Sequence, residues 1–132
     1  LIKKRKLTNV SISPSVDRKK LIQIILKSSV CVSLLSAKEL FKNALPSKIF
    51  EYMACKRPVI CNYGSAGNLV DLNKAGTVIK PEDSKELSSA ILKYFNEPNL
   101  IATHGISGFS YVKKHLAKED LIGELMRNFE NN

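Results

Sequence analysis

The sequence predicts an α/β fold in which a parallel, Rossmann-like sheet is covered by helices on both faces. Two observations carry this prediction. Short apolar runs rich in β-branched residues alternate with longer segments whose apolar residues recur every three or four positions. This alternation is typical of β-α-β units, in which each helix crosses over a sheet of parallel strands. The 132 residues suit one domain with its own hydrophobic core.

Four segments are predicted as strands. Residues 8–13 alternate in polarity, and residues 30–35 and 58–62 are almost wholly apolar. Continuous apolar runs of this kind are typical of strands buried on both faces of a parallel sheet. The fourth strand, at 77–79, follows Gly76, which we interpret as the glycine that ends the preceding helix.

The helices are predicted from apolar spacing and from their end signals. The first helix begins near Asp17, with Ser15 or Asp17 as its N-cap. The second begins at Pro46, because proline suits the first turn of a helix, and ends near Lys56. A short third helix is expected at 68–75.

The second half of the chain is predicted to be mainly helical. Asp83 with Glu86 three residues later is typical of a capping box, and apolar residues at helical spacing follow it. Two further helices close the chain. The last is amphipathic, with an apolar stripe within residues 121–129.

The composition limits the classes of partner. The chain has 21 basic and 12 acidic residues, a formal charge of +9, and the basic residues gather near the two ends. Such an excess fits nucleic acid, an anionic lipid surface or a phosphorylated small ligand. No aromatic cluster or groove-reading motif accompanies the basic residues, which argues against nucleic acid. No run approaches the roughly 18 apolar residues that a membrane span requires.

Neither the cysteines nor the histidines form a metal-binding pattern. The three cysteines (Cys31, Cys55 and Cys61) lie in apolar surroundings without C-x-x-C spacing, which indicates reduced core thiols of a cytosolic protein. His104 and His115 have no acidic or thiol partner at ligand spacing, so we expect no metal site.

Ligands of parallel α/β sheets bind at the carboxyl ends of the strands, beside helix N-termini. This rule selects the loops 14–16, 36–45 and 63–67. The second loop leads into Pro46, Ser47 and Lys48, where a helix start and an ammonium group can seat a diphosphate. Glu51 lies on the same predicted face as Lys48, so it can bind sugar hydroxyls. The alternative is an ordinary ion pair between Lys48 and Glu51.

Three motifs carry a resemblance to a known family. They are PSKIFEYMACKRPVI at 46–60, AG-x-V-x-x-PED-x-x-EL at 75–87, and G-x-x-G-x-x-YV at 105–112. With them, residues 8–130 resemble the carboxy-terminal, donor-binding domain of a GT-B glycosyltransferase of family 4, also called group 1. The resemblance implies a retaining transfer from a nucleotide sugar, usually without metal, between two Rossmann-like domains that face one cleft.

The resemblance also implies roles for individual residues. Glu51 matches the second glutamate of the family's E-x7-E motif, which bonds the donor ribose. The first glutamate is replaced by Asn43, and the usual G-F-G by residues 44–46, a departure that is similar in a branch of the family with the P-S-K-x-F-E-Y pattern. Asn43 can still hydrogen-bond a sugar hydroxyl, because an amide both donates and accepts.

The remaining implied contacts surround the nucleotide. Ser47 and Lys48, with the Pro46 backbone, face the diphosphate, and the turn at Ser15 and Val16 lies near the base. The donor is a UDP- or GDP-sugar, and no tightly bound cofactor is expected.

For the whole chain, the resemblance implies a partial nucleotide-sugar-binding domain over residues 1–132. The acceptor domain and the first strand and helix of the donor domain are absent from it, so this piece alone is expected to be inactive. The complete enzyme is expected to be a bacterial hexosyltransferase of cell-surface polysaccharide synthesis with a glycan or lipid-linked acceptor. Its expected location is cytoplasmic, and peripheral membrane contact through the basic helix 18–27 is compatible with it. Two alternatives stay open, a sugar-nucleotide 2-epimerase and a noncatalytic basic module that binds nucleic acid or anionic membrane.

Overall fold

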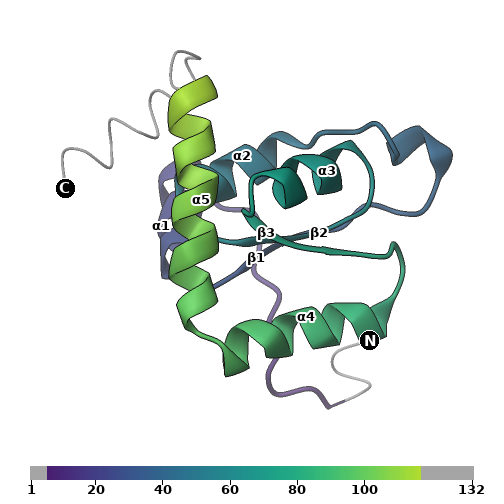
Figure 1. Cartoon of the computed structure of the whole chain (residues 1–132). Helices are drawn as coiled ribbons and strands as arrows, with labels where there is room; N and C mark the ends of the chain where they lie inside the picture. Colours follow the sequence, from purple (N-terminus) through teal and green to yellow (C-terminus); the bar gives the residue numbers. More distant parts are fainter. Residues whose placement is uncertain (1–5, 117–132) are drawn as a thin grey trace.

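A computed structural model describes residues 6–116 (Figure 1). Within them lies a parallel sheet of three strands in the order β1-β2-β3, formed by Cys31–Ser33, Val59–Asn62 and Gly76–Ile79. In its register Ser33 lies beside Cys61, and Cys61 beside Val78. The predicted parallel sheet is therefore confirmed. The predicted closing helix at 121–129 lies outside the described residues.

Helices cover both faces of this sheet, as predicted. In Figure 1, α2 and α3 lie above the sheet, α4 lies below it, and α5 crosses the sheet at one end of the strands. The helical elements are α1 (Arg18–Lys27), the 3-10 turn η1 (Glu39–Phe41), α2 (Ser47–Ala54), α3 (Ser65–Leu72), α4 (Ser84–Asn96) and α5 (Asn99–His115). None of the helices within residues 6–116 is both long and apolar enough to cross a membrane.

Strand β2 is the centre of the core. All four of its residues are buried, and successive side chains point to opposite faces. Val59 and Cys61 pack with Ile49 and Met53 of α2, and Val70 of α3 and Val112 of α5 join the same cluster. On the other face, Ile60 packs with Ile79, Ala90 and Tyr94. Burial of each large aliphatic side chain stabilises the fold by about 1.5–3 kcal/mol.

Strand β1 departs from its prediction. The expected strand over 30–35, buried on both faces, is only three residues long, and Val32 and Leu34 are 41% and 44% exposed. Cys31 packs against α1 and α2 through Ile25 and Cys55. On the opposite face α4 packs over Ile60 and Ile79 and leaves Val32 open. The prediction of burial on both faces was correct for β2 and wrong for β1.

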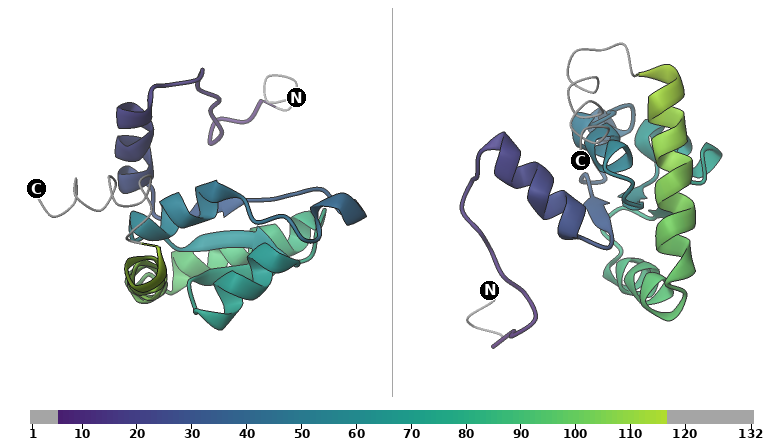
Figure 2. Two further views of the ribbon diagram at one scale, coloured as in Figure 1. Left: turned by 90° about the horizontal axis from the view of Figure 1, so that it is seen from above. Right: turned by 90° about the vertical axis from the view of Figure 1, so that its left-hand side faces the viewer.

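The strand predicted at 8–13 is not formed. These residues form neither strand nor helix and are exposed, with Ile12 84% exposed, and Figure 2 shows the segment passing outside the sheet. A strand is stabilised by hydrogen bonds and burial that only a neighbouring strand supplies. The described part of the chain places no strand beside this segment, so its alternating pattern is not realised as a strand.

The helix starts follow the predicted caps, with one correction. Asp17 caps α1 by accepting from the Lys20 amide at 2.8 Å, which decides between the two predicted candidates. Asp83 caps α4 by accepting from the amides of Lys85 and Glu86. Glu86 does not complete the capping box. Its carboxylate accepts from the Lys80 amide at 2.7 Å and pairs with the Lys80 ammonium at 3.3 Å.

Helix α3 begins three residues earlier than predicted and ends at Leu72. The residue with left-handed backbone after it is Lys74, at φ 48°, and not Gly76. Gly76 is the first residue of β3, where an added Cβ would lie 1.8 Å from the Val59 carbonyl oxygen. Glycine is needed there because the β2 and β3 backbones approach closely, so the helix-ending role that we predicted for it is wrong.

Candidate functional site

A cavity of about 260 Å³ lies where the three strands end. We call it the strand-end cavity. Its walls come from the loop after β1, the end of β2 and the loop after β3, including Ser36, Lys38, Lys42, Asn62, Tyr63 and Pro81. Two of the three predicted loops, 36–45 and 63–67, therefore contribute to one site. This is the edge at which open parallel sheets bind ligands.

Asn62 connects two walls of this cavity. Its side chain is buried, its Oδ1 accepts from the Leu35 amide at 3.0 Å, and its Nδ2 donates to the Leu35 carbonyl at 2.5 Å. The pair of bonds fixes the point at which the chain leaves β1. Asn62 was not among the predicted site residues, although a polar side chain at the end of an otherwise apolar strand is the signal that marks it.

The loop 36–45 is held at two further places. The Ala37 amide donates to Glu82 Oε1 at 3.2 Å, which ties the loop to the segment after β3. The Ser65 amide at the start of α3 donates to the Lys42 carbonyl at 3.0 Å. Gly64 permits this approach, because its φ is 122° and an added Cβ would lie 2.5 Å from the Lys42 oxygen. Hydrogen bonds thus hold the loop to the segments that follow β2 and β3.

The cavity wall carries a small positive charge. Lys38 and Lys42 contribute two positive charges and Glu39 one negative charge, so the sum is 2 − 1 = +1. Lys42 and Glu39 form an exposed ion pair at 3.4 Å. Exposed pairs of this kind contribute at most about 1 kcal/mol, so the lysine can turn toward an anionic ligand at small cost.

Helix α2 begins at the same edge of the sheet, because a helix that joins two parallel strands runs back toward their amino ends. Pro46 is its N-cap and provides no side-chain hydrogen bond, and the first amide bonded within the helix is that of Ile49. The amides of Ser47 and Lys48 therefore remain available, and both side chains are exposed. Pro46, Ser47 and Lys48 do not line the strand-end cavity. The loop 36–45 lines it and leads directly into these three residues.

Glu51 is directed toward α1. It is half-buried and lines a narrow hollow of about 10 Å³ together with Arg18, Leu21 and Cys55. Within residues 6–116 no ion pair joins Glu51 to Lys48, so the predicted alternative of an ordinary pair is not formed. Glu51 and the start of α2 share one helix, but Glu51 does not line the strand-end cavity.

The other predicted site residues are exposed. Asn43 lies between η1 and α2, one residue beyond Lys42 of the cavity wall. Ser15 and Val16 lie in the irregular segment before α1 and do not line the strand-end cavity. The structure thus groups Asn43 and Pro46 to Lys48 along one loop and helix start, and places Ser15 and Val16 on the side of α1.

The cysteines provide no nucleophile to this site. All three are buried and unpaired, which confirms the prediction of core thiols. Burial raises the pKa of Cys31 to about 11 and the pKa values of Cys55 and Cys61 to about 12. These thiols are therefore protonated at neutral pH, and it is the thiolate that is reactive.

Comparisons with known proteins agree with the predicted resemblance. The family model for group 1 glycosyl transferases matches residues 1–107. Among solved structures, sucrose-phosphate synthase from Thermosynechococcus elongatus is similar, with a TM-score of 0.75 and 22% identity. The match covers 98% of this chain and 32% of that one, so this chain spans about a third of its neighbour's length. A search of curated proteins finds no match. The chain belongs to the group 1 glycosyltransferase family.

Proposed function

We propose that this chain is the nucleotide-sugar donor-binding domain of a retaining hexosyltransferase. The donor is a UDP- or GDP-sugar, and the acceptor is a glycan or a lipid-linked glycan of cell-surface polysaccharide synthesis. The observation that carries the proposal is the strand-end cavity, which lies beside the start of α2 in a chain of the group 1 family. The acceptor would be bound by a further domain, so this chain alone would not transfer sugar.

The start of α2 would hold the diphosphate. The Ser47 and Lys48 amides and the positive end of the helix dipole attract an anion, and the Lys48 ammonium adds a full charge. Lys38 and Lys42 extend this positive region along the loop that lines the cavity. Charge grows on the departing nucleoside diphosphate during transfer, and these groups stabilise it without further reorganisation.

The hollow between α1 and α2, at about 10 Å³, is too small to hold a nucleoside, so the nucleoside would lie outside it, along the side of α2 that carries Glu51. Glu51 and Arg18 line the same hollow, and Ser15 and Val16 precede Arg18 by only two or three residues. A ribose bonded to Glu51 would therefore bring its base near Ser15 and Val16. Asn43, in the loop that leads into α2, would then meet the sugar.

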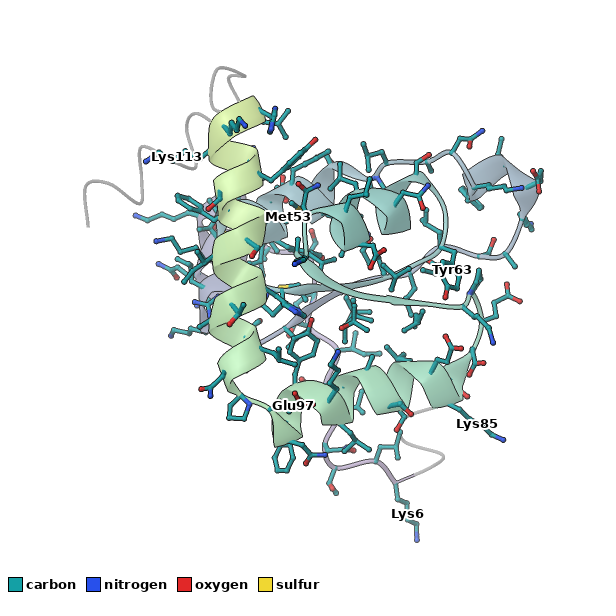
Figure 3. All side chains as sticks on the ribbon, viewed as in Figure 1. Lys6, Met53, Tyr63, Lys85, Glu97 and Lys113 are labelled. Carbon is teal, nitrogen blue, oxygen red and sulfur yellow. The ribbon has the colours of Figure 1, made fainter. Side chains whose placement is uncertain are left out.

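The test is a titration of the 132-residue chain with UDP, GDP and ADP, followed by backbone amide chemical shifts. We expect saturable shifts at Ser47, Lys48 and Glu51 for one of these nucleotides. Lys48→Ala should weaken that binding at least about tenfold, as a charged hydrogen bond is worth about 1.5–3 kcal/mol. Lys113→Ala is the matched control, since it removes an equal charge near the far end of α5, away from Tyr63 (Figure 3).

A second titration, with a plain single-stranded oligonucleotide, separates this proposal from the basic-module alternative. Binding of the oligonucleotide alone, with a steep dependence on salt and with shifts at basic residues distant from α2, would overturn the donor-site proposal. Equal weakening of UDP or GDP binding by Lys48→Ala and Lys113→Ala would overturn it as well, because only general charge would then matter.

A further inference from the structure

A second cavity, which we call the β3 groove, lies beside the strand-end cavity and shares Tyr63 with it. It has a volume of about 310 Å³, with α3 and α4 as its walls and β3 as its floor. Figure 1 shows β3 running between these two helices. The polar residues that line it are Tyr63, Asn68, Asp71, Thr77 and Lys93. Its volume falls within the range of small-molecule sites, about 300–1,000 Å³.

The side chains on the groove walls have no partners in the described fold. Within residues 6–116, no hydrogen bond or ion pair engages the side chains of Tyr63, Asn68, Asp71 or Lys93. The floor differs, because the Thr77 hydroxyl donates to the Tyr94 hydroxyl at 3.2 Å. The groove therefore combines a fixed floor with walls whose donors and acceptors are available to a ligand.

The charge of the groove favours a neutral ligand. Among residues 6–116, Lys93 and Asp71 are the charged residues that line it, and their sum is 1 − 1 = 0. The chain as a whole carries +9, so a polyanion would meet stronger attraction elsewhere on the surface. A phosphate-rich ligand thus gains nothing from this groove.

The residue types fit a carbohydrate. Tyr63 is 59% exposed, so its ring offers a broad apolar surface with a polar tip. Asn68 can donate and accept, Asp71 accepts, and Lys93 donates, which matches the hydroxyl groups around a sugar ring. A sugar presents C–H groups on its face and hydroxyls at its edge, and the groove offers an aromatic ring beside polar side chains.

We propose that the β3 groove binds a short, neutral, hexose-containing segment of a glycan. The choice of a glycan rests on the proposed function. Tyr63 lines both the groove and the strand-end cavity, so a segment in the groove would lie next to the donor site. The groove would then hold part of the growing glycan on the donor-binding domain itself.

The experiment titrates the chain with maltotriose, cellotriose and triacetylchitotriose and follows amide shifts. We expect saturable shifts at Asn68, Asp71 and Val78 for at least one of these trisaccharides. Asp71→Ala and Asn68→Ala should each weaken that binding about five- to tenfold, the effect of one lost hydrogen bond.

Substitutions at Tyr63 separate ring contact from the loss of a hydroxyl. Tyr63→Phe should retain most of the affinity, whereas Tyr63→Ala should lose it. Phe95→Ala is the matched control, because it removes an aromatic ring of α4 that is 80% exposed and does not line the groove. Equal weakening by Tyr63→Ala and Phe95→Ala would overturn the proposal.

The same samples distinguish this inference from the proposed function. Asp71→Ala should leave UDP or GDP binding unchanged, because Asp71 does not line the strand-end cavity. If a nucleotide binds and all three trisaccharides fail, the glycan groove is overturned and the donor site stands. If a trisaccharide binds and every nucleotide fails, the donor site is overturned and the groove stands. Binding of only an extended (Thr-Val)3 peptide, along the open edge of β3, would also overturn the glycan groove.

Discussion

The side chain of Asn62 and the main chain of Leu35 form a two-bond pair at the edge of the strand-end cavity. Nδ2 of Asn62 donates to the Leu35 carbonyl at 2.5 Å, and its Oδ1 accepts from the Leu35 amide at 3.0 Å. Asn62 is the last residue of β2, and Leu35 follows β1 by two residues. The pair thus couples the end of the central strand to the loop that leads into α2.

Asn62→Ala is therefore expected to affect both stability and the site. It leaves a partly buried donor and acceptor of Leu35 unpaired, which should lower the free energy of unfolding by about 1–3 kcal/mol. Nucleotide affinity should fall as well, because the loop 36–45 loses one of its anchors. Denaturant unfolding and a UDP or GDP titration measure the two effects.

Asn73→Ala is the matched control for this change. Asn73 also bonds a main-chain carbonyl, that of Leu69 at 2.8 Å, but at the far end of α3. It should lower stability by about 0.5–1.5 kcal/mol and leave nucleotide affinity unchanged. Equal loss of affinity in the two variants would contradict a positioning role for Asn62.

Two substitutions between α3 and β3 should have opposite effects on stability. Gly76→Ala places a Cβ 1.8 Å from the Val59 oxygen, so β2 and β3 must separate, at a cost of at least about 3 kcal/mol. Lys74→Gly relieves a left-handed backbone at φ 48° and should stabilise the chain by roughly 0.5–1 kcal/mol. Thermal and denaturant unfolding measure both, and a stabilising Gly76→Ala would show that the strands are less closely packed.

His104 should make stability depend on pH. Its Nδ1 lies 2.8 Å from the Tyr94 hydroxyl, and burial, aided by nearby Lys93, lowers the pKa of His104 below its usual 6.5. The unfolded chain therefore binds a proton at a higher pH than the folded chain. The stability contributed by neutral His104 is complete above about pH 6.5 and is lost as pH falls through the folded pKa.

The measurement is denaturant unfolding of the chain and of His104→Gln between pH 5 and pH 8. The unmodified chain should lose more stability on acidification than the variant. His115→Gln, at the end of α5, serves as the control and should keep the larger loss because His104 is still present. Parallel pH profiles for the chain and His104→Gln would contradict the assignment.

Peripheral contact with an anionic membrane remains a prediction. Helix α1 exposes Lys19, Lys20 and Lys27 beside Leu21 and Ile24, which are 39% and 42% exposed. A basic residue near an anionic surface contributes about 1 kcal/mol, so a double Lys19→Ala, Lys20→Ala variant should bind roughly thirtyfold more weakly. Co-sedimentation with phosphatidylserine-containing vesicles measures this.

The control for the membrane test is Lys113→Ala with Lys114→Ala, which removes the same charge from the end of α5. This variant should bind the vesicles as the unmodified chain does. Binding that both double variants weaken alike, or that vesicles of phosphatidylcholine alone support, would contradict specific contact through α1.

The features that were predicted correctly from the sequence depend on a few neighbouring residues. Asp17 and Asp83 cap their helices as predicted, because a cap requires only amides two or three residues away. The buried strand β2 and the helix that begins after Pro46 follow from local apolar spacing and from the backbone of proline. Two loops of the site, 36–45 and 63–67, were predicted for the same reason, since the ends of strands follow from the strands, whereas the loop after β3 was not predicted.

The features that could not be predicted depend on residues that lie far apart in the chain and meet only in the folded protein. Residues 8–13 have the pattern of a strand, but the pattern does not provide the neighbour that a strand requires. The Asn62–Leu35 pair joins residues 27 apart, and the direction of Glu51 toward Arg18 depends on how α1 packs on α2. Local patterns determine which element forms, whereas the partner of a side chain or strand is set by the packing of the whole fold.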